Sequence, residues 1–584
     1  MLRTPRLARL ALGVLLAFPG GAPRVSAAAP LPPTPGVLAR VPVGDSLAGL
    51  PVPAYAHLRG PDGADYVLAF APAAALAALR GSRSLAAAAD PAEFVVATER
   101  RRGARARAAS LAEVVLDDGR HVVARATAAQ AEALAAAGFD LARLPSTPVV
   151  AAAPEPLPSA IAYDPAIAAL VASVTPAAVE ETAGGLSGVH PVTVGGVPVT
   201  LTTRHTGSGE AISRATQHAF EHLAASGLAP AFHSWAASGW SGRNVVADLP
   251  GANRPSEVVV VCAHLDDRPE LGAAPGADDD ASGATGVLLA ARALAGTRFA
   301  RTIRFALFTG EEQGLLGSAS WAASLASAGA NVVAVLNLDM IGWDGAGTPT
   351  VLLHTRPTSS PGFTADAAIA DTFVRAAALY VEGALAPLAV ADGEPASDHA
   401  SFWNRGWPGV LAIEDDLSDL NPWFHTADDT LARLDLGYFT SFAKAAVATA
   451  AHLGEPAVPA ATFTPLTPCR IVDTRDAGRP AGLGLPAMPA HGTRTFSVAS
   501  LCGIPPDAVA LVVNATVVEP AAPGWVTLYP DSGTPPGTSS VHFSPGRIRS
   551  CSSVVPLAPG ALLGALNASA GPLHLVLDVS GAFR

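Results

Sequence analysis

The strongest constraint on the fold is an alternation of apolar runs with helical patterns between residues 161 and 457. The run EVVVVCAH, residues 257–264, has only apolar residues between its ends, as expected for a strand covered on both faces of a parallel sheet. The helical pattern ASGATGVLLAARALAG follows it, and TIRFALF then reads as a further strand. The alternation predicts an α/β domain with a mostly parallel, doubly wound sheet and helices on both faces.

The segments before and after this region differ from it in composition and in their secondary-structure patterns. Residues 28–160 are rich in Ala and hold two strand-then-helix patterns, DYVLAFAPAAALAALRG and GRHVVARATAAQAEALAAAG, before a Pro-rich linker at residues 144–160. We expect a small α+β region there, acting as a pro-segment that assists folding or covers the site, or as an accessory domain. Residues 462–584 hold short strand patterns between Pro- and Gly-rich turns, which predict an all-β domain.

The first 27 residues have the pattern of a secretory signal peptide. Three arginines precede the short apolar core LALGVLLAF, and VSAAAP supplies small residues for cleavage near Ala27 or Ala28. A membrane anchor is the weaker interpretation because the apolar core is too short. We find no later apolar stretch of spanning length, and therefore predict a secreted protein without a membrane span.

Cysteine usage is compatible with export. Cys469 and Cys502 are the candidate disulfide pair, which leaves Cys551 unpaired. Cys262 lies in an apolar strand pattern, where a packed thiol is expected.

Composition limits the function classes. The chain has 584 residues, enough for about three domains. Half of the residues are hydrophobic and 15% are charged, which provides for packed cores. The formal net charge of −12 argues against a nucleic-acid partner, because such a protein needs a basic face.

Acids and imidazoles follow the apolar strand patterns of residues 161–457 or the tight turns between them. In an open α/β sheet, ligands bind outside the carboxyl ends of the strands, so these side chains should converge at one edge. The set comprises His264, Asp266, Asp278, Asp279, Asp280, Glu311, Glu312, Asp339, His425 and Asp429.

Each member of this set has an ordinary interpretation when taken alone. A His-x-Asp is a surface pair, a triple Asp is a helix cap or a calcium site, and a Glu-Glu pair is solvated. Together, at least four carboxylates in one apolar cleft need compensating cations, and Arg268 is the only basic residue close in sequence. Imidazole among oxygen ligands favours zinc over calcium or magnesium, and the number of ligands favours two ions.

A family resemblance rests on motifs that occur in a fixed order. They are His-Leu-Asp, Gly-Ala-Asp-Asp-Asp-Ala-Ser-Gly, Glu-Glu-x-Gly-Leu-x-Gly-Ser, Leu-Asp-Met, Ser-Asp-His-Ala-Ser and His-Thr-x-x-Asp-Thr. Residues 161–457 thereby resemble the two-zinc exopeptidase family of bacterial leucyl aminopeptidases and glutamate carboxypeptidases. Residues 462–584, which begin near TPCRIVDTR, resemble the β-rich C-terminal module of many secreted bacterial proteins.

The resemblance implies a role for each residue of the site. Asp279 would bridge two Zn²⁺ ions. Glu312 and His425 would complete one metal site, and His264 and Asp339 the other. Asp266 would orient His264 from behind. Glu311 would be the general base toward a water molecule activated by the metals.

The resemblance also implies a substrate pocket. The stretch ADGEPASDHASFW has no flanking cysteines where the better-known secreted aminopeptidases carry a disulfide, and Glu394 stands near the place of a tyrosine in some of them. Asp398 and His399 match a motif that supports the structure. The expected pocket for the first side chain is apolar and comprises Leu411, Ile413, Leu417, Leu420 and Phe424.

These inferences predict a secreted zinc-dependent aminopeptidase that acts on peptides with a free, hydrophobic N-terminal residue. Three alternatives for the site stay open. A glutamate-carboxypeptidase-like enzyme would need an arginine cluster, for which Arg268, Arg356 and Arg405 are candidates. A glutaminyl-cyclase-like enzyme and a non-catalytic surface-binding relative are the others that concern the site. For the C-terminal domain, cell-surface attachment, sorting, substrate binding or a stabilising role are open.

Overall fold

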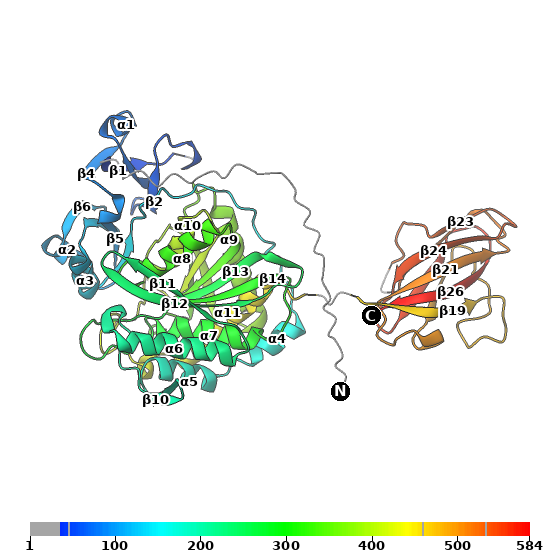
Figure 1. The fold of residues 1–584 in the computed structure, drawn as a ribbon. Coiled ribbons are helices and arrows are strands. Elements are labelled where there is room, and N and C mark those ends of the chain that lie inside the picture. Colours follow the sequence, from blue (N-terminus) through cyan, green and yellow to red (C-terminus); the bar gives the residue numbers. More distant parts are fainter. Residues whose placement is uncertain (1–35, 45–46, 458–460, 532–533) are drawn as a thin grey trace, which may run out of the picture. The chain divides into compact units, whose positions relative to one another are not determined.

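The computed structural model describes residues 36–44, 47–457, 461–531 and 534–584. The chain divides into two compact units, Met1–Ala457 and Val458–Arg584, which are described separately (Figure 1). The expected signal peptide lies outside the described residues.

An eight-stranded sheet forms the centre of the first unit. Its order is β11-β12-β14-β13-β15-β18-β16-β17. The inner strands β14, β13, β15 and β18 pair in parallel, whereas β11–β12, β12–β14 and β18–β16 pair antiparallel. The strands are β11 (Ala231–Ala237), β12 (Trp240–Leu249), β13 (Arg254–His264), β14 (Arg301–Phe308), β15 (Asn331–Leu338), β16 (Thr350–Thr355), β17 (Ala386–Ala391) and β18 (Val410–Ile413).

The sheet is therefore mixed, and the expectation of a mostly parallel sheet describes its centre better than its β11 edge. Strands β11 and β12 form a hairpin around Ser238 and Gly239, both of which have positive φ (51° and 85°). Two positive φ angles are the signature of a two-residue hairpin turn, which forces antiparallel pairing. The strands predicted from the sequence do not include this hairpin.

Helices cover both faces of the sheet, as predicted. Val259 and Val261 on β13 belong to the core with α5, α6, α7, α9 and α11, whereas Val258 and Val260 pack with α8 and α10 on the other face. Each fully buried Val contributes about 1.5–3 kcal/mol. The helices are α5 (Pro176–Leu186), α6 (Glu210–Ala225), α7 (Ala281–Leu294), α8 (Leu316–Ser327), α9 (Phe363–Tyr380), α10 (His399–Trp403) and α11 (Leu436–Gly454).

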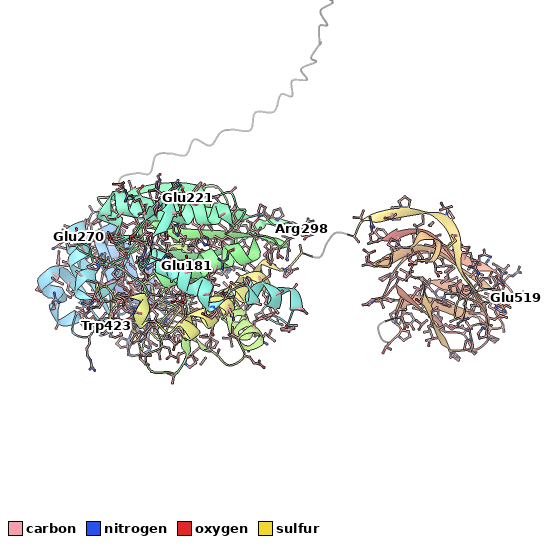
Figure 2. All side chains as sticks on the ribbon, turned by 90° about the horizontal axis from the view of Figure 1, so that it is seen from below. Glu181, Glu221, Glu270, Arg298, Trp423 and Glu519 are labelled. Atoms are coloured by element: carbon pink, nitrogen blue, oxygen red, sulfur yellow. A yellow bond between two sulfur atoms is a disulfide. The ribbon has the colours of Figure 1, made fainter. Side chains whose placement is uncertain are left out.

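Glu181 on α5 has an exposed side chain (Figure 2). Within the described residues, no single helix is long and apolar enough to span a membrane. The bent pair α4 (Pro165–Ala172) and α5 passes that test on length and composition alone.

The N-terminal part of the first unit contains two four-stranded antiparallel sheets. Their orders are β2-β3-β1-β4 and β6-β7-β5-β8, so both place their strands in the sequence second, third, first, fourth. Helix α1 (Ala73–Ala77) follows β3 and helix α3 (Ala128–Ala137) follows β7, which confirms the two predicted strand-then-helix patterns. The strands are β1 (Gly36–Pro42), β2 (Ala54–Arg59), β3 (Asp65–Ala71), β4 (Arg83–Ala88), β5 (Phe94–Glu99), β6 (Glu113–Asp117), β7 (His121–Arg125) and β8 (Phe139–Arg143).

The second unit is all β, as predicted. Two four-stranded antiparallel sheets, β19-β26-β21-β24 and β20-β25-β22-β23, share one apolar core. The strands are β19 (Phe463–Asp473), β20 (Thr493–Ser497), β21 (Ala510–Val518), β22 (Gly524–Pro530), β23 (Val541–Phe543), β24 (Arg549–Pro556), β25 (Leu562–Asn567) and β26 (His574–Phe583).

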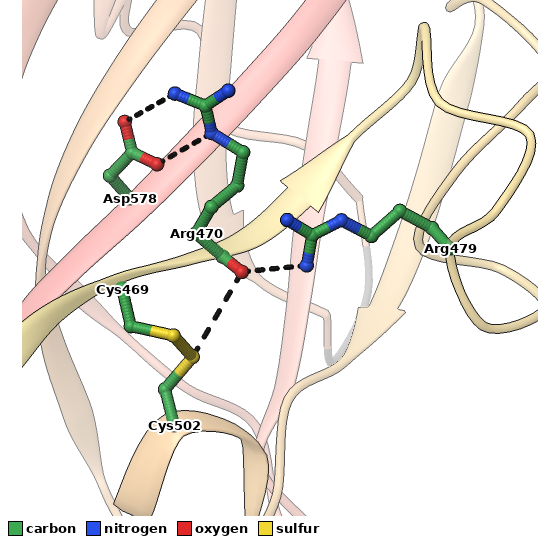
Figure 3. The surroundings of a disulfide bond; sticks show 5 residues. All are labelled: Cys469, Arg470, Arg479, Cys502 and Asp578. Atoms are coloured by element: carbon green, nitrogen blue, oxygen red, sulfur yellow. Dashed lines mark hydrogen bonds and ion pairs between the residues drawn. A yellow bond between two sulfur atoms is a disulfide. The ribbon is translucent and has the colours of Figure 1, made fainter.

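The predicted disulfide between Cys469 and Cys502 is present and ties β19 to a short 3-10 turn (Figure 3). Beside it, the Arg470 guanidinium forms an ion pair with Asp578, and Arg479 donates to the Arg470 carbonyl. Cys551 is a free, exposed thiol.

Replacing Cys469 and Cys502 together by Ser should destabilise the second unit. The bridge closes a loop of 33 residues, so its loss should cost about 3–4 kcal/mol. Hydrogen exchange of the full-length protein, followed by mass spectrometry, should show faster exchange in peptides from residues 461–584. Peptides from β13 and β14 provide the internal control, and unchanged protection in β19 and β26 would contradict the prediction.

Candidate metal centre

The predicted ligands lie on loops at the carboxyl ends of the inner strands. His264 ends β13, Glu312 follows β14, and Asp339 follows β15 directly. Asp279 precedes α7, and His425 lies between β18 and α11. Parallel pairing of β14, β13 and β15 brings these strand ends to the same edge of the sheet.

The five side chains form two sets of three that share Asp279. His264, Asp279 and Asp339 make one set, and Asp279, Glu312 and His425 the other. Within each set the candidate ligand atoms lie within 4.8 Å of one another. We call them the His264 triad and the His425 triad. The structure thus brings together every residue predicted to bind metal.

Asp279 faces both histidines through different oxygens. His264 Nε2 lies 3.2 Å from Asp279 Oδ1, and His425 Nε2 lies 3.2 Å from Asp279 Oδ2. The remaining partners are also near, since His264 Nε2 is 3.5 Å from Asp339 Oδ1 and His425 Nε2 is 2.9 Å from Glu312 Oε2. A carboxylate with one oxygen toward each triad is suited to bridging two ions.

The donor set fits divalent cations. Asp279 Oδ2 and Glu312 Oε1 are buried and lack a hydrogen-bond partner among the described residues. Burial lowers the pKa of His425, but the Glu312 and Asp279 carboxylates outweigh it and raise that pKa to about 10. The site therefore attracts positive charge, and buried acceptors without donors suit a metal ion.

The three consecutive acids have separate tasks. Asp280 caps α7, because its Oδ1 accepts a hydrogen bond of 2.7 Å from the Gly283 amide. Asp278 Oδ1 accepts from the Gly342 amide at 2.8 Å. Of the three acids, only Asp279 directs its carboxylate at His264 and His425. The cap interpretation of the sequence is thus right for one acid of the three.

Asp429 positions the loop that carries these acids. Its Oδ2 accepts hydrogen bonds of 3.1 Å from the backbone amides of Asp278 and Asp279. Burial raises the pKa of Asp429 to about 8, and the Asp278 charge adds to this rise. The sequence placed Asp429 at this edge without giving it a role.

Asp266 holds two parts of the site. Its backbone carbonyl lies 3.1 Å from His264 Nδ1, whereas the nearest carboxylate oxygen is 3.7 Å from that nitrogen. The carboxylate instead accepts hydrogen bonds from the Thr206 hydroxyl (2.8 Å) and the Gly310 amide (2.9 Å). The backbone carbonyl of Asp266 therefore orients His264, as expected of this residue. The side chain of Asp266 instead fixes the turn after β14.

That turn requires glycine and presents two adjacent acids. Gly310 has φ of +77°, and a Cβ there would lie 2.4 Å from the Trp235 ring. The next residues, Glu311 and Glu312, both point their backbone amides at the Asp266 carboxylate, at 3.4 Å. A tight turn anchored on one buried carboxylate thus fixes the backbone of both acids.

Glu311 and Glu312 have different surroundings. Burial raises the pKa of Glu311 well above its ordinary value, and the charges of Asp398 and Asp339 raise it further against the effect of His264. Glu312 belongs to the His425 triad and accepts a 2.8 Å hydrogen bond from Arg268 Nε through Oε2. Glu311 is thus a proton-accepting candidate, and Glu312 a charged ligand candidate.

Comparison with known proteins agrees with this geometry. Residues 244–450 match the model of Peptidase family M28. A probable leucine aminopeptidase of Trichophyton verrucosum is 34% identical over 224 residues, which cover 36% of this chain and 57% of the relative. One of Arthroderma otae is 35% identical over 223 residues, which cover 37% and 58%. The chain thus spans somewhat more than half the length of these relatives.

Among solved structures, the LapA aminopeptidase of Legionella pneumophila aligns with 63% of this chain and 99% of its own. The identity is 19% and the TM-score 0.49. Residues 244–450, the M28 segment, contain all five residues of the two triads.

Ser397 is a residue of the site that sequence reasoning missed. Its hydroxyl donates a 2.6 Å hydrogen bond to Asp339 Oδ2 and accepts one of 2.7 Å from Asn337. It precedes Asp398 and His399 in the M28 segment, and His399 Nε2 lies 2.8 Å from the Glu394 carbonyl. The Ser-Asp-His-Ala-Ser motif predicted a structural role for Asp398 and His399. Nothing in the sequence indicated that the Ser397 hydroxyl would bind a metal-ligand candidate.

The predicted substrate-pocket residues separate into two groups. Leu411, Ile413, Leu420 and Phe424 pack in one small apolar cluster. Leu417 is instead 57% exposed and lines a different, polar pocket with Glu394.

Glu394 is occupied by the N-terminal part of the chain. Its carboxylate accepts hydrogen bonds from Thr98 Oγ1 at 2.8 Å and from Arg120 at 3.5 Å. Its assignment to the substrate pocket stays a prediction.

Replacing Asp266 by Ala should loosen the turn that carries Glu311 and Glu312. The Thr206 hydroxyl and the Gly310 amide would lose a buried acceptor, and each such loss costs about 1–3 kcal/mol. We expect a lower free energy of unfolding in urea and a lower zinc content. Asp248→Ala is the matched control, because Asp248 pairs with Arg304 at a partly exposed site. Wild-type stability of Asp266→Ala would contradict this role.

Proposed function

We propose that the protein is a zinc-dependent aminopeptidase that releases N-terminal residues from peptides. The observation that carries the proposal is the pair of buried triads that share Asp279, with the buried Glu311 directly preceding the triad member Glu312. The match of residues 244–450 to Peptidase family M28 and the leucine aminopeptidase names of the relatives support it. An intact donor set also argues against a non-catalytic binding role.

Two zinc ions suit the donor set of three carboxylates and two imidazoles. Zinc would supply Lewis-acid polarisation of the scissile carbonyl and would make a water molecule more acidic. Asp279, with one oxygen toward each histidine, would hold both ions, while the other four residues would divide between them.

Glu311 is the proposed general base and acid. Its carboxylate would take a proton from the attacking water and deliver it to the leaving amine nitrogen. Positive charge in the triads would lower the raised pKa of Glu311 toward the range in which a carboxylate can accept a proton. The turn anchored by Asp266 fixes the Glu311 backbone next to Glu312, and the Glu311 side chain belongs to neither triad.

Two of the three arginines that the sequence suggested for the carboxypeptidase alternative are engaged within the chain, whereas Arg405 is half-buried and forms no ion pair among the described residues. Arg268 is buried and donates to Glu312 and Glu132. Arg356 is buried and forms hydrogen bonds of 2.7 and 2.8 Å with Asp366. Both guanidinium groups are thus engaged by carboxylates of the chain, and neither is open to a substrate carboxylate. Their engagement removes two of the three candidates for binding a substrate carboxylate.

Secretion is part of the proposal. It rests on the signal-peptide pattern of residues 1–27 and is supported by the Cys469–Cys502 disulfide, which requires an oxidising compartment. The all-β second unit would then act outside the cell, and attachment to the cell surface stays open as its role.

We expect a preference for apolar N-terminal residues such as Leu, Met or Phe. Four of the predicted pocket residues form one apolar cluster, and each added methylene should contribute about 0.8 kcal/mol, or about fourfold in kcat/KM. Anilides of Ala, 2-aminobutyrate and norvaline provide the series. N-acetylated leucine anilide is the control and should not be cleaved. A preference for acidic or basic N-terminal residues would contradict the pocket.

The paired variants Glu311→Gln and Glu312→Gln test the proposed function. Glu311→Gln should keep both zinc ions and lower kcat by about 10²–10⁴-fold, because only proton transfer is lost. Glu312→Gln should lower zinc content and thermal stability, because metal binding is coupled to the folded state. Elemental analysis and kcat are measured on both variants. Metal loss in Glu311→Gln alone would reverse the assignment, and wild-type hydrolysis by both would refute the site.

A further inference from the structure

Helix α3 of the N-terminal part contacts the His425 triad directly. The Ala135 carbonyl lies 3.0 Å from His425 Nδ1. A carbonyl can only accept, so Nδ1 carries the proton and Nε2 keeps its lone pair for the triad. An outer partner of this kind fixes the ring orientation and basicity of a metal-binding histidine.

The accepting carbonyl is itself held in place. Ala135 lies in the last turn of α3, and its oxygen also accepts a 2.9 Å hydrogen bond from the Gly138 amide. Gly138 ends the helix with φ of +104°, and a Cβ there would lie 2.3 Å from Arg101 Cβ. The negative end of the helix dipole therefore faces the protonated nitrogen of His425.

Helix α3 also acts on Glu312, which like His425 belongs to this triad only. Glu132 pairs with Arg268 at 2.9 and 3.2 Å, and Arg268 donates to Glu312 Oε2 and to the Glu312 carbonyl, both at 2.8 Å. The Arg268 side chain is 1% exposed, so Glu132 and Glu312 together balance its charge. Without Glu132, an unbalanced guanidinium would compete with a cation for Glu312.

The His264 triad has its outer contacts inside the peptidase domain predicted at residues 161–457. His264 is oriented by the Asp266 carbonyl at 3.1 Å, and Asp339 accepts from Ser397 at 2.6 Å. The two triads thus differ in where their outer hydrogen-bond partners come from. Those of the His264 triad lie within residues 161–457, whereas the His425 triad also depends on residues 128–137.

Further contacts anchor the N-terminal part near α3. Arg100 forms buried ion pairs with Asp416 and Asp140, and Arg101 Nη2 donates to the Phe424 carbonyl at 2.6 Å. Phe424 directly precedes His425, so the hydrogen bond from Arg101 also fixes the backbone next to His425.

We propose that α3 is a built-in part of the His425 metal site, in which Glu132 and the Ala135 carbonyl are positioning groups that set the affinity of one zinc ion. The inference rests on the proposed two-zinc function. It assigns the N-terminal part a lasting role in the active centre, beyond that of a segment to be removed. Loss of α3 contacts should weaken one ion and spare the other.

The test uses full-length protein carrying Glu132→Gln, with zinc as the probe and chelator competition as the measurement. We expect one of the two zinc dissociation constants to rise about 10–100-fold and the other to stay within twofold. Glu132→Asp should restore part of the loss. Glu113→Gln is the matched control, because Glu113 is 57% exposed and pairs with Arg125. Combining Glu132→Gln with Glu312→Gln should add no further loss of zinc affinity.

The outcomes separate the two proposals. Two unchanged constants in Glu132→Gln would overturn the role of α3 while leaving the two-zinc function intact. Equal weakening of both constants would also overturn it, because general destabilisation acts on both sites. A wild-type protein that binds fewer than two zinc ions would overturn the proposed function and this inference together. Circular dichroism of the zinc-free Glu132→Gln protein confirms that the variant is folded.

Discussion

Mutual repulsion among buried carboxylates is the constraint on which this structure depends. Burial raises the pKa of Glu311 and of Asp280 well above their ordinary values, and neighbouring acids add to the rise. Such a cluster is stable only if hydrogen bonds or cations compensate each charge. Asp266 and Asp429 accept hydrogen bonds from backbone amides and thereby fix the loops. Asp279 and Glu312 keep buried oxygens without donors among the described residues, which leaves them for cations.

The same division explains why two glutamates stand side by side. A turn that needs Gly310 lets one carboxylate, Asp266, hold the backbone of both acids, so their side chains are free for different work. Arg268 then distinguishes them, because it binds Glu312 and not Glu311. The turn at Gly310 and the Arg268 guanidinium thus give the two adjacent acids different roles. Glu312 is suited to be an ionised ligand, and Glu311 to accept a proton.

Much of this could be predicted from the sequence, for physical reasons. Apolar runs such as residues 258–263 mark inner strands, and chain direction then places their terminal acids at one edge. The antiparallel hairpin β11–β12 was missed although the Ser238-Gly239 dipeptide is typical of a turn, because its two strands lack a continuous apolar run. The contribution of α3 had no sequence signal, since a backbone carbonyl is offered by any residue at position 135. The exposure of Leu417 depends on packing that motif spacing does not encode.

The central claim is that two metal ions occupy the two triads. Anomalous diffraction from crystals of the zinc-loaded protein, recorded on both sides of the zinc absorption edge, tests it most directly. The account predicts two zinc peaks about 3.5–4 Å apart, with Asp279 between them, His264 and Asp339 on one, and Glu312 and His425 on the other. A single peak, or zinc bound away from Asp279, would contradict it.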